Sequence, residues 1–404
     1  MSIKRYFNYF ICACKICIAF VYTQINKKKL YGQNIWLIRE KHTEARDNSF
    51  HLYKYIRENH PEINAYYTIT KNNSPDRKKV LPYGNIIDSE SFKHYVYFLS
   101  AKCSIGSQLF GACPYPTSFV HRFQFLCRKD QKVIYLKHGI YKDELSHDLD
   151  YAKARFALIC CAASREQEFI MNTYGYPNSI AQLVGLCRYD NLITKEQPKY
   201  QVLIMPTFRK WLAAEKREVS ATKEECEKFK HSEFYKQYTQ LLSNYSLLSA
   251  AKESGYKIVF YLHYSLQSYS ETFKPLNNEI VTIADRQNYD VQQLMIESSV
   301  MVTDFSSVFF DFAYMKKPEV YFQFDEEEYR AKHYAKGYFD YRRDGFGPVF
   351  TSSDDVVNYL ITLMKNRCKM EQTYQEKVDM FFAFRDNHNC ERTYKAIKDI
   401  DERE

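Results

Sequence analysis

The segment of residues 300–329 constrains the fold of this 404-residue chain more than any other stretch. It opens with Val300–Thr303, a short apolar run of residue types that favour β-strands. Asp304, Ser306 and Ser307 offer short polar side chains where a helix would begin, and an apolar helix body is expected over 308–315. A Lys-Lys-Pro sequence then ends the helix, and a second strand is expected at Glu319–Phe322. This order of strand, turn, helix and strand predicts a parallel α/β sheet.

The turn in this segment has the chemistry of a phosphate site. Backbone N–H groups at the start of such a helix point to one place beyond the carboxyl end of the strand. Ser306 and Ser307 add hydroxyl donors there. Asp304 or Asp311 would orient these hydroxyls or accept a hydrogen bond from a ligand hydroxyl. The alternative is that Ser306 only caps the helix.

Strands and helices alternate through most of the remaining chain, which predicts further βαβ units. Further strands are expected at residues 34–38, 65–69, 86–87, 101–105, 133–136, 156–160, 202–205 and 258–262. Further helices are expected at 49–59, 91–99, 164–174 and 291–298, with two more inside 222–253 and others near 354–366 and 370–384.

The sequence Gln197-Pro198-Lys199 interrupts this alternation and marks a domain boundary. We expect four parts, namely an N-terminal apolar helix (1–30), two doubly wound α/β domains (31–197 and 198–370) and a C-terminal helical segment (371–404). The chain is long enough for two domains of ordinary size.

Charge and cysteine content narrow the classes of partner and environment. The net charge of +8 suits nucleic acid, anionic lipid or a phosphorylated substrate. We rank nucleic acid last, because no nucleic-acid-binding module is recognisable. The 12 cysteines form neither a disulfide framework nor paired zinc-binding spacings. A reducing, cytoplasmic setting is therefore expected.

The first 30 residues combine an apolar run over 7–22 with basic residues on both sides. The run is short of a clean membrane span, and a charge at Lys15 would be costly in mid-bilayer. One interpretation is a helix lying on the inner face of the cell membrane. The other is a helix packed on the protein itself, and the sequence leaves both open.

Imidazole and guanidinium groups follow several predicted strands, where α/β proteins place functional groups. His138 precedes a glycine turn, and its neutral ring could take a proton from a hydroxyl near pH 7, or it could be structural. Arg209, in a Thr207-containing loop, could grip two phosphate oxygens or pair with a carboxylate. Arg188 could likewise reach a phosphate or clamp a turn through an aspartate, and His263 ends another strand.

Taken in order, these sequences resemble the CDP-glycerol glycerophosphotransferase family, whose members polymerise the polyol-phosphate chains of teichoic acids and related capsules. The strongest likeness is TDFSSVFFDFA at 303–313, followed by the Lys-Pro stop. Weaker likenesses, spread over residues 34–348, are DNS at 47–49, HGIYKDELS at 138–146, GLCRYD at 185–190, PTFR at 206–209, YLHY at 261–264 and DVQQL at 290–294. The HGIYK form is similar to the capsule-type variant of the family.

The resemblance implies a GT-B-like architecture, in which two doubly wound Rossmann-type domains face a central cleft. It implies His138 as the base that activates the acceptor hydroxyl, and it places three residues on the acceptor side: Lys142, Asp47 and Asn48. His263 would steady charge on the leaving group. The donor diphosphate would be held with the help of Arg209, Thr207, Ser306, Ser307, Asp304, Asp311 and Arg188.

The expected function is transfer of a polyol phosphate, glycerol phosphate in the first place, from a CDP-linked donor to a glycan or lipid-linked acceptor, with release of CMP. No cofactor or metal is expected, because no D-x-D sequence follows a strand; Asp148-Leu149-Asp150 lies in a polar loop. A GT-B glycosyltransferase that moves a sugar is one alternative, and a non-catalytic partner in a polymer-synthesis complex is another. The polyol, the acceptor and the number of units added stay open.

Overall fold

The structure, a computed structural model, describes residues 3–72, 74–145, 147–194, 196–213 and 221–402. By their internal contacts these residues form two compact units. The first is made of Met1–Ile140, Ser146–Asn191 and Asp386–Glu404, and the second of Tyr141–Leu145 and Leu192–Arg385. The division differs from the expected boundary at 197/198, and the expected C-terminal segment 371–404 is shared between the units.

The first unit is built on a seven-stranded parallel sheet with the strand order β3-β2-β1-β4-β5-β6-β7. This order is doubly wound, because the chain builds outward from β1 on one side and from β4 on the other. Its strands are β1 (Trp36–Arg39), β2 (Ala65–Ile69), β3 (Ile86–Asp88), β4 (Cys103–Gly106), β5 (Lys132–Tyr135), β6 (Leu158–Cys161) and β7 (Ala181–Leu183).

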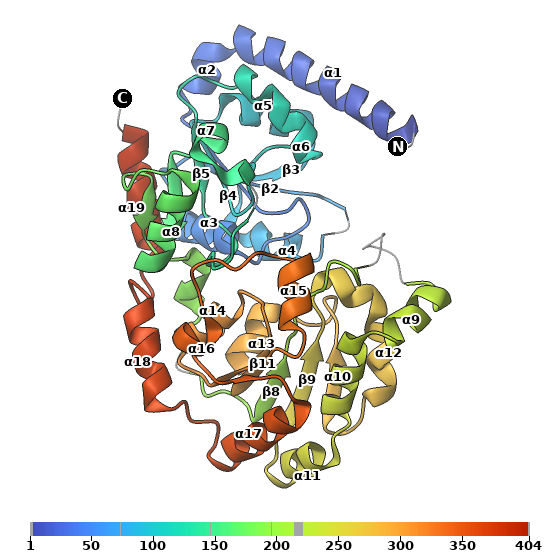
Figure 1. The fold of residues 1–404 in the computed structure, drawn as a ribbon. Coiled ribbons are helices and arrows are strands. Elements are labelled where there is room, and N and C mark those ends of the chain that lie inside the picture. Colours follow the sequence, from blue (N-terminus) through green and yellow to red (C-terminus); the bar gives the residue numbers. More distant parts are fainter. Residues whose placement is uncertain (1–2, 73, 146, 195, 214–220, 403–404) are drawn as a thin grey trace. The chain divides into compact units, whose positions relative to one another are not determined.

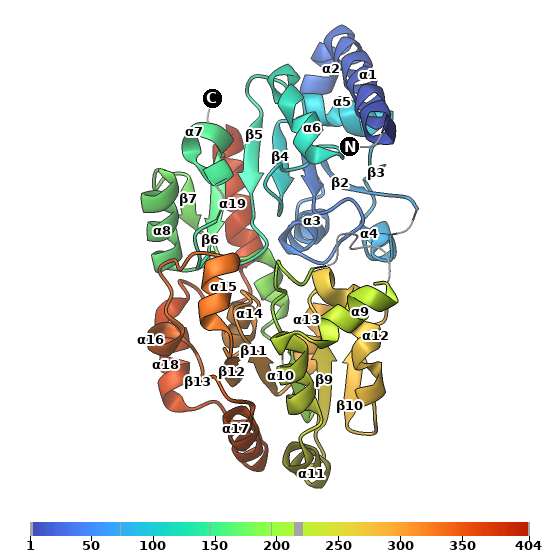
Figure 2. The same cartoon turned by 45° about the vertical axis from the view of Figure 1, so that its right-hand side comes forward.

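Helices cover both faces of the first sheet (Figures 1 and 2). Leu37 faces helices α1 and α5, whereas Ile38 faces α3 and the C-terminal helix α19, which explains why the last residues return to this unit. The helices of this unit are α1 (Ile3–Ile25), α2 (Lys27–Tyr31), α3 (Asn48–Asn59), α4 (Arg77–Val80), α5 (Phe92–Ser100), α6 (Thr117–Val120), α7 (Tyr151–Ala154), α8 (Ser164–Tyr174) and α19 (Asn389–Glu402).

The second unit is built on a six-stranded parallel sheet with the order β10-β9-β8-β11-β12-β13, which is also doubly wound. Its strands are β8 (Gln201–Ile204), β9 (Lys257–Tyr261), β10 (Val281–Ala284), β11 (Val300–Thr303), β12 (Glu319–Phe322) and β13 (Val349–Phe350). Its helices are α9 (Lys223–Lys230), α10 (Glu233–Leu242), α11 (Tyr245–Glu253), α12 (Ser270–Phe273), α13 (Val291–Glu297), α14 (Phe309–Tyr314), α15 (Glu326–Lys332), α16 (Tyr341–Asp344), α17 (Ser353–Lys365) and α18 (Gln372–Phe381).

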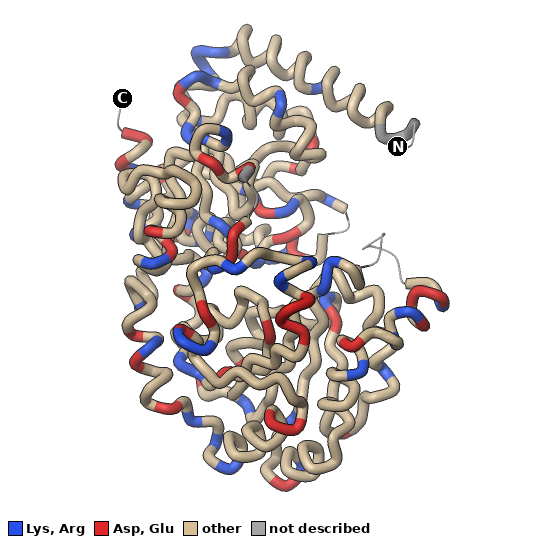
Figure 3. The backbone as a smooth tube through the Cα atoms, viewed as in Figure 1, with Lys and Arg blue, Asp and Glu red and all other residues tan. Residues whose placement is uncertain are grey.

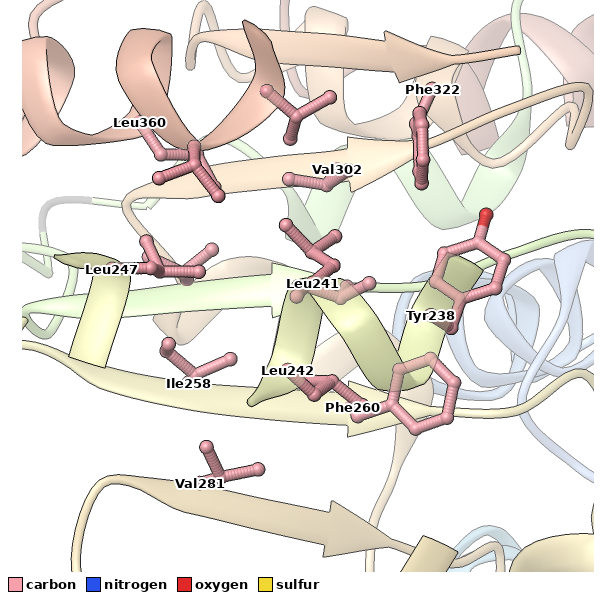
Figure 4. Packing of buried hydrophobic residues seen from close by; sticks show 14 of the residues in the cluster. Tyr238, Leu241, Leu242, Leu247, Ile258, Phe260, Val281, Val302, Phe322 and Leu360 are labelled. Carbon is pink, nitrogen blue, oxygen red and sulfur yellow. The ribbon is translucent and has the colours of Figure 1, made fainter. Parts of the chain in front are cut away.

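Residues 222–253 form three helices rather than the two expected. Each of the three has its own N-cap, because the side chains of Thr222, Ser232 and Asn244 each accept a hydrogen bond from a backbone N–H one turn later. Leu241 of α10, Leu247 of α11 and Leu360 of α17 then pack onto one face of the sheet (Figure 4).

Helix α1 is long and apolar enough, by length and composition, to cross a membrane over Tyr6–Ile25, and it is the one such helix among the described residues. Its chain carries a single charged residue in this stretch, Lys15 (Figure 3). Ile16 and Ala19 are fully buried against the first unit. The Nζ of Lys15 lies 3.5 Å from the carbonyl oxygen of Glu90, so this charge is used within the protein.

Candidate active site

The polar residues of the second unit gather at the carboxyl edge of its sheet. The strand order reverses between β8 and β11, and ligands of doubly wound sheets bind at such switch points. Thr207 follows β8, and the half-buried Ser306 and Ser307 follow β11. These three hydroxyl residues, all predicted from the sequence, are therefore brought to one place by the parallel register of the two strands.

Arg209 lies beneath this edge and not on its surface. Its guanidinium is fully buried, pairs with Asp304 at 2.9 Å, and donates to both carboxylate oxygens of Asp325 at 2.7 and 2.8 Å. It also donates to the carbonyl oxygen of Thr207. The donors of Arg209 hold the two loops that follow β8 and β11, together with Asp325, and its role as a ligand of the diphosphate stays a prediction.

Asp304 and Asp311 are also buried, and their contact with a ligand hydroxyl stays a prediction. One carboxylate oxygen of Asp304 accepts hydrogen bonds from the backbone N–H groups of Thr207 and Phe305, at 2.8 and 2.6 Å. Helix α14 begins at Phe309 and has six residues, so it is shorter than expected. Asp304 thus shapes the turn that presents Ser306 and Ser307.

Three aromatic rings, those of His263, Phe208 and His333, contact one another in sequence at this edge. The ring of His263 stacks on Phe208 with centroids 4.6 Å apart, and Phe208 meets His333 edge-on at 4.6 Å. The Nδ1 atom of His263 accepts from the backbone N–H of Ser265, which assigns the ring proton to Nε2. Burial and nearby cations lower the pKa of His333 to about 3, so its ring is neutral.

This edge holds buried polar atoms that no described residue hydrogen-bonds. They are Oγ1 of Thr207, Oγ of Ser265, Nε of Arg330 and both ring nitrogens of His333. Buried polar groups are normally satisfied, so these atoms are available to a ligand at this strand edge. Sequence reasoning missed Ser265, Arg330 and His333, although Arg330 lies in the helix that follows β12 and His333 directly follows that helix, at the same strand edge.

In the first unit, four predicted residues meet at the carboxyl edge of the sheet. Arg188 donates to the carboxylate of Asp47 at 2.8 Å and to the carbonyl oxygen of His138 at 2.9 Å. The amide of Asn48 joins the same network, donating to the carbonyl oxygen of Lys137 and accepting from the backbone N–H of Arg188. Arg188 therefore clamps the His138 loop, the second of its two interpretations, and its contact with the donor phosphates stays a prediction.

Three further residues that the sequence did not single out hold this edge together. Buried Glu40 accepts backbone hydrogen bonds from Arg46, Asp47 and Phe50, and so fixes the start of α3. The buried side chains of Lys137 and Glu166 form an ion pair. Lys137 has a φ of +59°, a left-handed conformation that turns the chain immediately before His138. Only the tertiary structure brings these charges together.

His138 combines an exposed surface with a lowered basicity. Its residue is exposed by accessible area, yet the imidazole is desolvated. This desolvation lowers the pKa of His138, opposed by the attraction of Asp47 and aided by the positive charge of Arg188. The ring is therefore neutral at pH 7 and can accept a proton.

Lys142, predicted on the acceptor side, makes its contacts within the second unit, and its acceptor role stays a prediction. Residues 141–145 belong to the second unit. The Lys142 ammonium is buried, pairs with Asp143, and lies 5.3 Å from the ring centroid of Tyr341. Asp143 also pairs with Arg330 at 2.7 Å. Gly337 is required here, because a Cβ at this position would lie 2.2 Å from the carbonyl oxygen of Lys142.

Comparison with known families identifies the chain. Residues 20–399 match the family described as CDP-glycerol:poly(glycerophosphate) glycerophosphotransferase. The chain belongs to this family. It is the family that the strand-end sequences of this chain resemble.

Two relatives illustrate how much of the chain is shared. The minor teichoic acid biosynthesis protein GgaB of Bacillus subtilis (strain 168) is 34% identical over 384 residues, 94% of this chain and 41% of the relative. The teichoic acid poly(glycerol phosphate) polymerase of Staphylococcus epidermidis is 34% identical over 134 residues, 32% of this chain and 17% of the relative. This chain therefore spans less than half the length of either family relative.

Solved structures confirm the expected fold class. The wall teichoic acid polymerase TagF has a TM-score of 0.69 and 18% identity, covering 98% of this chain and 97% of that chain. A UDP-N-acetylglucosamine 2-epimerase from Listeria monocytogenes has a TM-score of 0.54 and 11% identity, covering 90% and 95%. The fold is GT-B-like, with two parallel α/β sheets and an N-terminal apolar helix.

Proposed function

We propose that this chain transfers glycerol phosphate from CDP-glycerol to a hydroxyl of an acceptor polymer and releases CMP. Family membership supports this donor, and a solved structure of a TagF variant comes from a soak with CDPG. The observation that carries the proposal is the cluster of buried, unsatisfied polar atoms at the switch point of the second sheet. The HGIYK form of the His138 loop supports an acceptor of the capsule type.

The groups at the switch point suit a diphosphate. The hydroxyls of Thr207, Ser306 and Ser307 donate hydrogen bonds to phosphate oxygens, and Arg330 supplies positive charge beside them. His263, with its proton on Nε2, donates to the oxygen that becomes negative as CMP leaves. Arg209 acts indirectly, because it fixes Asp304 and thereby the turn that carries the serines.

The reaction needs one base and one leaving group. His138 takes the proton of the acceptor hydroxyl, and the acceptor oxygen attacks the β-phosphorus of the donor in line with the bond to the α-phosphate oxygen. That bond breaks, a phosphodiester forms, and CMP leaves with the bonding electron pair. Positioning and charge stabilisation supply most of the acceleration.

A donor panel tests this function. The protein is incubated with a glycerol-phosphate-primed acceptor and, separately, with CDP-glycerol, CDP-ribitol, UDP-glucose and UDP-N-acetylglucosamine. Acceptor-dependent release of CMP from CDP-glycerol is the expected result. Release of UDP from a nucleotide sugar would favour the sugar transferase instead, and no nucleotide release from any donor would favour a non-catalytic partner.

The lowered pKa of His138 predicts the pH dependence of transfer. Only the neutral ring is a base, so the rate falls as pH drops through the pKa of His138. Because that pKa lies below the ordinary value of 6.5, the acid limb of kcat/KM should have its midpoint below pH 6.5. Asp47→Asn removes an attraction that raises the pKa and should move the midpoint further down. A midpoint above 6.5, or an upward shift in Asp47→Asn, would contradict His138 as the base.

We also propose that α1 holds the protein on an anionic membrane surface. One face of α1 packs on the first unit through Ile16 and Ala19. The other face leaves Phe7, Phe10 and Ile18 between 61% and 66% exposed. Lysines at 27–29 follow the helix and would meet lipid headgroups. Packing and membrane binding, the two alternatives left open by the sequence, are thus compatible.

The double variant Phe10→Ser/Ile18→Ser should bind membranes more weakly without unfolding. Loss of two apolar side chains that would insert into the lipid should weaken partition into the membrane roughly tenfold or more. Co-sedimentation with phosphatidylglycerol vesicles measures the effect, and the melting temperature should stay within about 2 °C because both positions are exposed. Tyr245→Ser, at an exposed aromatic residue of the second unit, is the control. Equal sedimentation of the double variant and this control would refute the membrane role.

A further inference from the structure

Arg39 is a buried arginine for which none of the described residues supplies a partner. It is the last residue of β1, lies opposite Gly106 of β4, and is 3% exposed. Its Nε and Nη1 atoms are buried without a hydrogen-bond acceptor, and the described residues place no carboxylate within ion-pair distance. A buried guanidinium left in this state is energetically costly.

The other buried arginines of the described chain show how unusual this is. Arg128, Arg188 and Arg209 each form ion pairs with aspartate side chains. Each of these three buried guanidinium groups is thus paired with a carboxylate of the chain. Among the described residues Arg39 departs from this rule, which points to a bound ligand as its partner.

The groups around Arg39 do not supply the missing negative charge. Burial and the charge of Arg39 lower the pKa of His94 to about 3, and the two ring nitrogens of this neutral histidine are used by Glu90 N–H and the Ala112 carbonyl oxygen. Burial raises the pKa of the Cys113 thiol to about 12, so it is neutral as well. Glu90 attracts Arg39 electrostatically but lies beyond ion-pair distance.

The place of Arg39 in the fold is one where ligands bind. The strand order of the first sheet reverses between β1 and β4, and Arg39 stands at the carboxyl end of β1. Crevices at such switch points are the usual ligand sites of doubly wound sheets. A guanidinium offers parallel N–H donors that match two oxygens of a phosphate group.

We propose that Arg39 binds a phosphate ester of the acceptor, and so selects acceptors that already carry polyol phosphate. The identity of this ligand as the acceptor rests on the proposed function, because the first unit also carries His138, the proposed acceptor base. Asp47 and Asn48, which hold the His138 loop, begin the helix that follows β1. Arg39 and the residues that hold this loop therefore both belong to the carboxyl end of β1 and the connection after it.

Thermal unfolding with a soluble phosphate ester tests the site. sn-Glycerol 3-phosphate should raise the melting temperature of the wild-type protein by roughly 2 °C or more at saturation. Arg39→Met should melt at the same or a higher temperature without ligand, because it removes an unpaired buried charge, and should lose the ligand-dependent rise. Arg165→Met, at an exposed arginine of the same unit, should keep that rise.

Transfer kinetics give a second readout. In Arg39→Met the KM for a glycerol-phosphate-primed acceptor should rise about tenfold or more, while the KM for CDP-glycerol stays unchanged. Arg39→Lys keeps the charge but loses the paired donors, so its KM for the acceptor should lie between those of the wild type and Arg39→Met. It also serves as the test protein if Arg39→Met does not fold.

The outcomes separate the Arg39 site from the proposed function. An unchanged ligand-dependent rise in Arg39→Met, or a large loss of ligand-free stability in both Arg39 variants, would overturn the site and make Arg39 structural. Wild-type protein that releases no CMP would refute the proposed function, while the thermal comparison would still decide the site. Loss of binding to phosphatidylglycerol vesicles in Arg39→Met, without any effect of glycerol 3-phosphate, would assign the site to a lipid headgroup and overturn the acceptor.

Discussion

His138→Ala should lower the turnover of glycerol-phosphate transfer by about 10²–10⁴-fold, the usual contribution of a general base. The reason is local: the ring follows β5 at the carboxyl edge of the first sheet, its loop is clamped by Arg188, and its lowered pKa keeps it neutral at pH 7. The loss should fall on kcat, with donor binding retained, because His138 acts on the acceptor hydroxyl. Acceptor-dependent CMP release under saturating donor measures it.

Two companion variants make this result specific. His138→Gln keeps a hydrogen-bonding side chain but cannot act as a base at pH 7, so it should be as slow as His138→Ala. His231→Ala, at an exposed histidine of the second unit, should have wild-type turnover. A folded His138→Ala protein with turnover within about threefold of wild type would remove His138 from the mechanism.

Arg209→Met should reduce the free energy of unfolding by about 3–5 kcal/mol, the cost of breaking a buried ion pair by removing one partner. The guanidinium is fully buried between Asp304 and Asp325, so its loss leaves two carboxylates without their cation. Denaturant unfolding followed by circular dichroism measures the change. Donor binding should weaken as well, because Asp304 shapes the turn that carries Ser306 and Ser307.

The control is Arg286→Met, at an exposed arginine of the same unit, which should change stability by no more than about 0.5 kcal/mol. The two interpretations of Arg209 predict different results. A direct phosphate ligand would give a stable Arg209→Met protein that binds CDP-glycerol poorly, and this outcome would overturn the buried role described above.

The regular elements with strong local patterns were predicted well from sequence. β2, β11, β12 and α8 have the expected bounds, because each is a compact apolar run or an amphipathic stretch with clear ends. The edge strands β7, β10 and β13 were not predicted, since they are short and only partly apolar. Their strand structure depends on pairing with a neighbour already in the sheet, and local sequence does not encode that neighbour.

The candidate site divides in the same way. Thr207, His138 and His263 were singled out from the sequence, because they follow strands and parallel strands end at one edge, whereas Ser265 and His333 were missed. The ion-pair partners of the charged residues were not predicted. Arg209 and Lys142 carry the same charges whether they are exposed or buried, and which applies depends on carboxylates far away in the sequence, such as Asp325 and Asp143.

The sequence by itself determined the alternation of strands and helices, the family, and the identity of the groups at the strand ends, because these are written in local periodicity and spacing. Only the tertiary structure decided which charged side chains form ion pairs within the protein. Ion-pair partners are chosen by proximity in the folded chain, so the pairing of Arg209 and the isolation of Arg39 are properties of packing.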